Sequence, residues 1–261
     1  MYEFNYHKAG SVADAAAMLS KHPEARLLAG GQTLIAAMKL RLASPSDVID
    51  LSGVKELSGI KVDGGGVTVG AMTTHAAVAT SKDVMKAIPA LARLAGSIGD
   101  RMVRNMGTLG GSVANNDPAA VVGLGATILT NKRKIGAGEF FKGMFETALQ
   151  AGEIITAVSF PVPKRAGYVK FKNPASRYAI VGVFVAETAG GMRVAVTGAG
   201  PSVFRVTEME KALASKFSAD TVANIKVAAA GLNSDMHASA EYRAHLVTVM
   251  ARRAVEQALA G

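Results

Sequence analysis

Two glycine-rich stretches carry the residue types that could bind an anion. The first glycine loop consists of Ala29, Gly30, Gly31, Gln32 and Thr33. A short apolar run precedes it and a helical pattern follows, so its backbone N–H groups would lie at a helix N-terminus, where the helix dipole favours negative charge. The two glycines let the backbone approach a diphosphate, and Gln32 and Thr33 add side-chain donors. An ordinary strand–helix turn is the alternative interpretation of this spacing.

The second glycine loop consists of Thr108, Leu109, Gly110, Gly111 and Ser112. Glycine is dense here, a hydroxyl lies on either flank, and asparagines follow, a composition that suits a second backbone cradle. A β-bulge or a packed turn is the alternative. One such loop is weak evidence, but two in one domain favour a shared, extended anionic ligand.

Other kinds of chemistry lack their signatures in this chain. A P-loop pattern is missing, and the two candidate dinucleotide fingerprints, at residues 123–125 and 198–200, lack the third glycine, which argues against a Rossmann fold. No serine has the surroundings of a nucleophile elbow. The histidines do not have the spacing of a zinc helix, so the sequence predicts no metal site and makes each a surface or capping residue: His7, His22, His75, His237 and His245. Redox chemistry would therefore need a bound cofactor.

Composition narrows the partners and the compartment. The chain of 261 residues has no cysteine, so any iron–sulfur cluster would have to be on a partner chain. Neither a secretory signal nor an apolar run long enough to span a bilayer is evident, and we expect a cytoplasmic protein without an integral membrane segment. The net charge is +9, but the basic runs are short and aromatic residues make up 5%, which disfavours nucleic acid.

Helices and strands alternate irregularly around the two loops, which predicts an α+β domain. A helix is expected from Ser11, as N-cap, to His22, where Pro23 stops it. The other expected helices span residues 33–42, 74–80, 84–96 and 139–150. The expected strands span residues 26–29, 47–51 and 154–160, with hairpins at 59–70 and 126–135.

From about residue 167 the pattern changes to a sheet followed by helices. Strands are expected at residues 169–171, 179–187 and 192–197, and helices at 207–215, 219–229 and 239–259. A sheet with a helical tail predicts a second, smaller domain.

In the two glycine loops and several other segments, the chain resembles a known family, the FAD-binding medium subunits of the molybdenum hydroxylases. It is similar in particular to the medium chain of aerobic-type carbon monoxide dehydrogenase. The resemblance covers nearly the whole length. The matching segments keep the family's order, which makes them more specific than either loop alone: residues 28–34, 39–45, 98–99, 104–111, 173–183 and 237–243.

This resemblance implies a two-subdomain FAD-binding fold of the vanillyl-alcohol-oxidase or PCMH type, followed by a small C-terminal domain of sheet and helices. The expected limits are 1–165, with subdomains of about 1–55 and 56–165, and then 166–261. Both glycine loops would hold the FAD diphosphate. Ile98 would pack on the isoalloxazine ring, and Ile155 and Lys172 would approach the cofactor.

The resemblance also implies partners. A large subunit would hold molybdopterin and oxidise the substrate, and a small subunit would hold two [2Fe-2S] clusters, in a dimer of heterotrimers. Electrons would run from molybdenum through the clusters to FAD and on to an outside acceptor. The large subunit sets the substrate, so carbon monoxide, an N-heterocycle, an aldehyde and an aromatic acyl thioester are all open, as is the acceptor.

Two departures from the family pattern motivate a second hypothesis. Ser112 stands where the family usually has asparagine, and residues 116–120 run directly into 121–123, where the family continues with an FAD-contacting aspartate. Loss of one hydrogen bond to a charged group costs roughly 1.5–3 kcal/mol, so weak FAD retention is expected. The alternative is an assembly or binding subunit that keeps the fold and holds no flavin.

Overall fold

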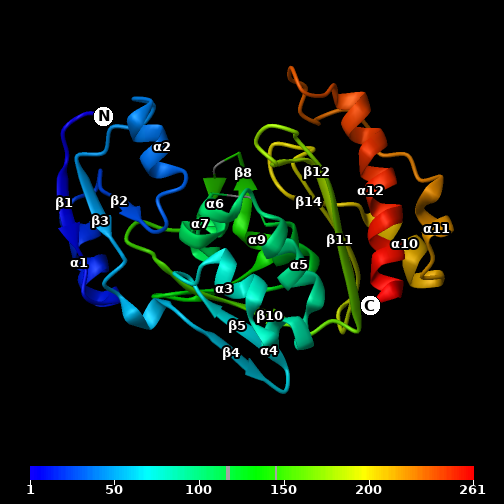
Figure 1. The fold of residues 1–261 in the computed structure, drawn as a ribbon, viewed down its shortest axis with the longest axis horizontal. Coiled ribbons are helices and arrows are strands. Elements are labelled where there is room, and N and C mark those ends of the chain that lie inside the picture. Colours follow the sequence, from blue (N-terminus) through cyan, green and yellow to red (C-terminus); the bar gives the residue numbers. More distant parts are fainter. Residues whose placement is uncertain (116–117, 145) are drawn as a thin grey trace.

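The structure is a computed structural model that describes residues 1–115, 118–144 and 146–261. Three parts follow one another along the chain and lie in a row (Figure 1). The first is built on a small parallel sheet, the second on a five-stranded antiparallel sheet with short helices, and the third on a four-stranded antiparallel sheet covered by a long helix. The predicted α+β class, with a C-terminal domain of sheet and helices, is confirmed.

The first part has the strand order β1-β3-β2, and both strand pairs are parallel. Its elements are β1 (Asn5–Lys8), α1 (Val12–Lys21), β2 (Arg26–Leu28), α2 (Leu34–Lys39) and β3 (Asp47–Asp50). The predicted N-cap of α1 is confirmed, because Ser11 accepts a hydrogen bond from the backbone N–H of Asp14 at 3.1 Å. The first glycine loop lies between β2 and α2, as its pattern predicts.

The second part has the strand order β4-β5-β10-β6-β7, and a 3-10 turn at Lys55–Leu57 precedes it. Its strands are β4 (Ile60–Asp63), β5 (Gly66–Gly70), β6 (Thr127–Thr130), β7 (Lys134–Gly136) and β10 (Ile155–Pro161). Both predicted hairpins are confirmed as antiparallel pairs. In the first hairpin, Asp63 accepts hydrogen bonds from the N–H groups of Gly65 and Gly66, which fixes the turn.

Between β5 and β6, the described residues form six short helices: α3 (His75–Thr80), α4 (Lys82–Ala87), α5 (Pro89–Ser97), α6 (Arg101–Met106), α7 (Leu109–Ala114) and α8 (Ala119–Gly123). The predicted helix at 84–96 is divided at Ile88, because Pro89 cannot continue a helix and instead begins the next one. The second glycine loop contains the N-cap Thr108 and the first turn of α7, not an isolated turn.

The predicted helix at 139–150 is wrong. The structure has α9 (Ala137–Phe140), then the two-stranded sheet of β8 (Phe141–Gly143) and β9 (Glu146–Thr147); residue 145 lies outside the described residues. Phe140 is fully buried, and its ring meets that of Phe141 edge to face at 5.0 Å. Glycine at 143 also disfavours a helix. Packing of the buried Phe140 and the partly buried Phe141 thus overrides the helical periodicity.

The third part has the strand order β11-β12-β13-β14. Its elements are β11 (Arg165–Lys172), β12 (Ala179–Thr188), β13 (Gly191–Thr197), β14 (Phe204–Arg205), α10 (Thr207–Ser215), α11 (Ala219–Ala223) and α12 (Ala240–Ala260). The three predicted strands and the two outer helices are confirmed. The predicted helix at 219–229 ends at Ala223, and β14 is an addition that the sequence did not predict.

The sheet of the third part has a core on each face, because side chains alternate along a strand. Val183 and Val185 face α10 and α12, whereas Phe184 belongs to the core of the second part. Arg193 also donates to the carbonyl oxygen of Val122 in α8 at 3.3 Å. The third part is therefore packed firmly against the second. Within the described residues, no helix is long and apolar enough to cross a membrane.

Candidate functional site

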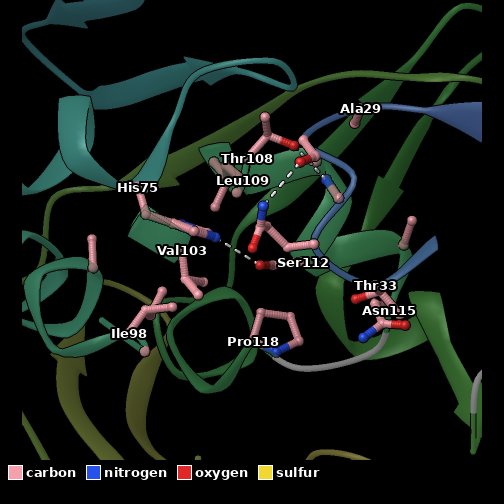
Figure 2. A pocket seen from close by; sticks show the side chains of 18 of the residues that line it. Ala29, Thr33, His75, Ile98, Val103, Thr108, Leu109, Ser112, Asn115 and Pro118 are labelled. Carbon is pink, nitrogen blue, oxygen red and sulfur yellow. Dashed lines mark hydrogen bonds between the residues drawn. The ribbon is translucent and has the colours of Figure 1, made fainter. Parts of the chain in front are cut away.

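A cavity of about 720 Å³ lies where the three parts meet. Residues of both glycine loops and Ile98 line it (Figure 2). Ile155 lines it as well. The structure thus brings these predicted site residues together from segments far apart in the sequence. Lys172 differs: it is exposed and is not among the lining residues. A volume of this size is typical of pockets for large organic ligands.

The first glycine loop offers backbone donors to this cavity. Gly31 has a φ of 71°, a left-handed conformation that glycine adopts without strain. In the described part of the chain, the N–H groups of Gly31, Gln32 and Thr33 donate to no protein atom. The side chain of Thr33 makes no capping bond, so its hydroxyl is also available. Such a row of donors suits a phosphate group.

The second glycine loop differs, because the protein itself satisfies the amides of its residues 109–112. Leu109 and Gly110 donate to the carbonyl oxygens of Thr73 and Ala71 at 3.0 and 2.8 Å. Gly111 donates to Oγ1 of Thr108 at 3.2 Å, and Ser112 to the Thr108 carbonyl oxygen at 3.1 Å. This loop therefore offers hydroxyl groups to the cavity in place of the backbone cradle that its composition suggests.

The two loops are packed against each other through glycine. A Cβ added to Gly30 would overlap the carbonyl oxygen of Met106, just before the second loop. A Cβ added to Gly110 would lie 2.6 Å from Cβ of Ala71. These two glycines are explained by close approach of protein backbone. Of the paired glycines in the first loop, it is Gly31 whose conformation shapes the donor row.

His75 is a site residue that the sequence analysis missed. It begins α3, is only 4% exposed and lines the cavity, so the expectation of a surface or capping histidine is wrong here. Its Nε2 lies 2.9 Å from Oγ of Ser112, as Figure 2 shows. Burial lowers the pKa of His75 from 6.5 to about 4. The imidazole is therefore neutral at pH 7, and Ser112 satisfies its buried nitrogen.

Apolar side chains form another wall of the cavity. Ile98 follows α5, and Ile155 is the first residue of β10, 7% exposed. Arg104 in α6 donates to the carbonyl oxygen of Ile98 at 3.0 Å, which holds this turn in place. Val103 of α6 lies beside it in the cavity wall. An apolar wall opposite a row of amide donors suits a ligand with one aromatic and one anionic end.

The third part closes the cavity with residues that the sequence analysis did not assign to the site. Lys170 of β11 donates to the carbonyl oxygens of Ser97 and Arg177 at 2.7 and 2.9 Å, and so joins the second part to the third. Arg177 has a φ of 61°, unusual for a residue with a side chain. Lys170, Arg177 and Tyr178 all line the cavity. A sheet edge from another domain leaves no local sequence signal of this kind.

Glu153 brings an acidic group to the same cavity, but it is already paired. Its carboxylate bonds to Arg133 at 3.0 and 3.1 Å, and this interaction holds the pKa of Glu153 down at about 2. The N–H of Gln150 and the hydroxyl of Thr130 donate to it as well. Its charge is therefore compensated and does not oppose an anion at the first glycine loop.

The segment with the shortened family pattern also borders the cavity. Pro118, Ala119 and Ala120 line it, and α8 begins at Ala119. Asn116 and Asp117, which belong to the same sequence pattern, lie outside the described residues. Ser112, the other departure, bonds to His75, so the structure gives its hydroxyl a role within the protein.

Comparison with known proteins gives two family matches in sequence. Residues 2–163 match the FAD binding domain in molybdopterin dehydrogenase, and residues 166–258 match the CO dehydrogenase flavoprotein C-terminal domain. The chain is 36% identical to the carbon monoxide dehydrogenase medium chain of Afipia carboxidovorans, with 98% of this chain and 97% of the relative covered. It is 33% identical to the glyceraldehyde dehydrogenase medium chain of Sulfolobus acidocaldarius, with 98% of each covered.

Comparison with solved structures agrees with the sequence matches. The reconstituted CO dehydrogenase from Oligotropha carboxidovorans contains a chain that matches with a TM-score of 0.90 and 34% identity. The match covers 99% of this chain and 98% of that one. The whole chain, with both its glycine loops and its C-terminal domain, is thus similar to one kind of subunit.

Proposed function

This chain belongs to the FAD-binding medium subunits of the molybdenum hydroxylases, and we propose that it holds FAD in the cavity between its three parts and relays electrons in a larger oxidoreductase. The chain is an oxidoreductase component, and FAD is its cofactor. The observation that carries the proposal is the row of N–H groups at Gly31, Gln32 and Thr33, which have no partner among the described residues and lie beside an apolar wall. The residues present therefore fit an aromatic diphosphate.

The proposed roles follow from the donors. The N–H groups of the first glycine loop, with the hydroxyl of Thr33, would bind the diphosphate, while Gln32 would donate from its side chain. The hydroxyls of Thr108 and Ser112 would supplement them, with Ala29 and the second glycine loop as the supporting wall. We expect no covalent link, since neither loop has a histidine or cysteine.

The apolar wall would receive the flavin ring. Ile98 and Ile155 would pack on it and exclude water, and Arg104 would keep the turn of Ile98 in position. When bound, FAD supplies the redox chemistry, taking electrons from partner clusters and passing them to an outside acceptor. The protein's own contribution is to bind the cofactor and to set its surroundings. The domain limits 1–165, with subdomains of about 1–55 and 56–165, and 166–261 form part of this proposal.

The proposed partners are a molybdopterin-binding large subunit and a small subunit with [2Fe-2S] clusters, in a cytoplasmic dimer of heterotrimers. Two observations support this division of labour. The sequence has no cysteine, so it offers no thiolate for a cluster. The names of the relatives describe medium chains, and these relatives are similar over nearly their full length.

Substrate choice is proposed to reside on another subunit. Relatives of similar identity are named for carbon monoxide dehydrogenase and for glyceraldehyde dehydrogenase. A gas and a sugar-like aldehyde share few chemical groups that one kind of cavity could recognise. The shared element is the flavin-binding fold, so this chain alone does not select the substrate.

The test is retention of FAD. The full chain is incubated with FAD and desalted, and the bound flavin is measured by its visible absorbance and by release on heating. We expect about one FAD per chain. Gly110 is unsuited to a test by substitution because its packing on Ala71 would confuse folding with binding. A colourless chain that also fails to bind added FAD would contradict the proposal.

A further inference from the structure

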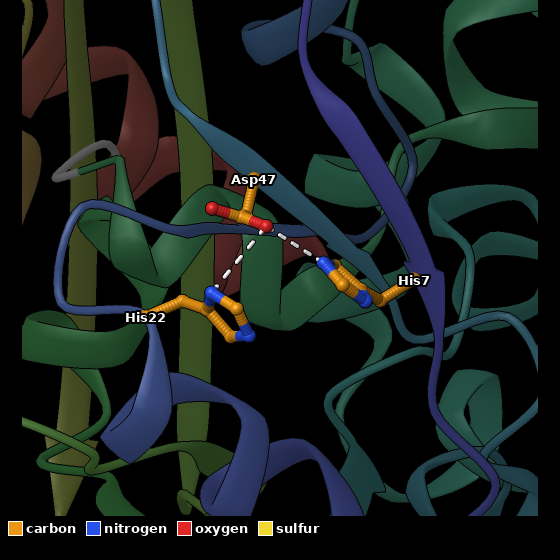
Figure 3. Close-up of side chains that lie close together, drawn as sticks. All are labelled: His7, His22 and Asp47. Carbon is orange, nitrogen blue, oxygen red and sulfur yellow. Dashed lines mark hydrogen bonds and ion pairs between the residues drawn. The ribbon is translucent and has the colours of Figure 1, made fainter.

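Three polar side chains meet in the first part of the molecule, and none of them lines the cavity. His7 comes from β1, His22 follows the last residue of α1, and Asp47 begins β3. Figure 3 shows both imidazole rings turned toward the same carboxylate. The three residues are separated by 15 and 25 positions in sequence, which is why the spacing of the histidines gave no sign of this cluster.

The distances are those of a small ligand set. Nε2 of His7 lies 2.7 Å from Oδ1 of Asp47, and Nδ1 of His22 lies 3.5 Å from the same oxygen. One ligand atom from each residue lies within 4.8 Å of the others. Tetrahedral zinc with bonds of about 2.0–2.2 Å separates its ligand atoms by roughly 3.3 Å. Small side-chain rotations would therefore admit an ion.

The backbone holds all three residues in place. In the parallel pair of β1 and β3, Asn5 lies opposite Asp47, so His7 shares a sheet face with Asp47 two positions on. The N–H of His22 donates to the carbonyl oxygen of Met18, and its own carbonyl accepts from Ala25. Little ordering would be needed at the moment of binding.

The carboxylate of Asp47 is held in the way that is typical of a carboxylate that binds a metal ion. Its side chain is 6% exposed, and its second oxygen accepts a hydrogen bond from Oγ of Ser46 at 2.7 Å. A hydrogen bond to the far oxygen fixes a ligating carboxylate and is typical of metal sites. Within the described residues, the ion pairs of Asp47 are with the two histidines alone, so no lysine or arginine occupies the position of a cation.

The site is also open to an ion from solvent. The imidazoles are 29% and 37% exposed above the buried carboxylate. Two imidazole nitrogens and one carboxylate oxygen are donors that suit zinc and its neighbours among the transition metals. Calcium and magnesium prefer a shell of oxygens, which this cluster does not provide.

We propose that His7, His22 and Asp47 bind one divalent transition-metal ion of the zinc type, with water in the remaining position. The ion would link β1, the end of α1 and β3, and would thereby stabilise the subdomain that carries the first glycine loop. This inference does not depend on FAD binding, because the cluster lies outside the cavity.

The test is zinc binding by the full chain. The chain is stripped with a chelator and dialysed to equilibrium against zinc, and bound metal is measured by atomic emission. We expect one zinc per chain, and at least about tenfold weaker binding in His22→Ala and in Asp47→Asn, since each loses a ligand. His237→Ala is the matched control, because His237 is exposed and distant in sequence.

A second measurement guards against misfolded variants. Zinc is expected to raise the melting temperature of the parent chain and of His237→Ala. It is expected to leave the melting temperature of His22→Ala unchanged. Magnesium at the same concentration is expected to raise none of them. Equal zinc uptake by the parent chain and His22→Ala, or uptake by neither, would overturn the proposal and leave the cluster as a structural hydrogen bond between His7 and Asp47.

Discussion

In the first glycine loop, the N–H groups of Gly31, Gln32 and Thr33 donate to no protein atom within the described residues. In the second glycine loop, the N–H groups of residues 109–112 all donate to protein oxygens. The two loops are similar in composition, since each combines paired glycines with hydroxyl residues. They differ in how much hydrogen-bonding capacity is left for a ligand.

This difference shows that glycine content alone does not identify a phosphate cradle. In the second loop, Gly110 allows the backbone to approach Ala71, and just before the loop Gly107 packs on the ring of His75. The second loop and the residues just before it support the first loop, which lies against Met106 through Gly30. We therefore assign diphosphate binding mainly to the first loop and its positioning to the second.

The largest effect is expected where the loops touch. Gly30→Ala would place a methyl group on the carbonyl oxygen of Met106, and backbone cannot yield as a side chain does. We expect a loss of about 3 kcal/mol of unfolding free energy, the upper part of the range for overpacking, together with loss of FAD. Urea unfolding measures the first and flavin retention the second. Gly138→Ala is the control, since its added methyl meets nothing within 4 Å.

His75, which bonds to Ser112 of the second loop, predicts that the free energy of unfolding depends on pH. His75 has a folded pKa of about 4 against an ordinary value of 6.5, so the unfolded chain binds its proton more readily. The contribution of neutral His75 to the free energy of unfolding is therefore complete above pH 6.5 and is lost as the pH falls from 6.5 through 4. This contribution amounts to roughly 3 kcal/mol. Urea unfolding of the parent chain and His75→Gln between pH 7 and 4 measures it.

Only the difference between those two chains is diagnostic. Glu153, whose folded pKa is about 2, loses its own contribution at lower pH, between its ordinary 4.5 and 2. An acid-induced loss of the same size in His75→Gln would show that His75 is not responsible.

The two hydroxyl residues provide a matched pair. Thr33→Val removes a hydroxyl that makes no capping bond within the described residues, so we expect FAD binding about tenfold weaker with unfolding free energy unchanged. Thr108→Val removes the acceptor for the Gly111 N–H, so we expect a loss of about 1 kcal/mol in stability, with a smaller loss of FAD affinity than in Thr33→Val because this hydroxyl only supplements the first loop. Titration with FAD and urea unfolding of both variants separate the roles. The same pattern in both variants would erase the distinction between the loops.

The smallest effect is expected at Lys172. Because it is exposed and does not line the cavity, Lys172→Ala should leave FAD affinity within about twofold, as for most surface changes. Lys170→Ala loses bonds to Ser97 and Arg177 and should weaken FAD binding by roughly fivefold. Fluorescence titration of the two variants compares them. A larger effect at Lys172 would return that residue to the site.

Sequence patterns predicted the fold where local signals are strong. The Ser11 cap, the Asp63 turn and the apolar run at residues 179–187 each depend on neighbours in sequence, and the structure has these elements. The wrong helix predictions arise where tertiary contacts determine the local structure. Burial of Phe140 replaces the predicted helix with two short strands, and Pro89 divides another helix.

The candidate site could be predicted in part for the same reason. The two glycine loops are evident from the sequence. The acceptors of the amides in the second loop are not, because they include the carbonyl oxygens of Ala71 and Thr73, which no local pattern indicates. His75 was missed because its burial follows from packing between α3 and the second loop. Lys170 comes from another domain altogether, and β11 shows no binding motif around it.

Hydrogen exchange of individual amides, measured by NMR on the full chain without and with FAD, tests the central claim most directly. Unpaired amides exchange rapidly and become protected when a ligand binds them. We predict that the N–H groups of Gly31, Gln32 and Thr33 exchange rapidly without FAD and slow markedly with it, while those of Leu109 and Gly110 are protected in both states. Protection of the first loop without FAD, or a larger change in the second loop than in the first, would contradict the account.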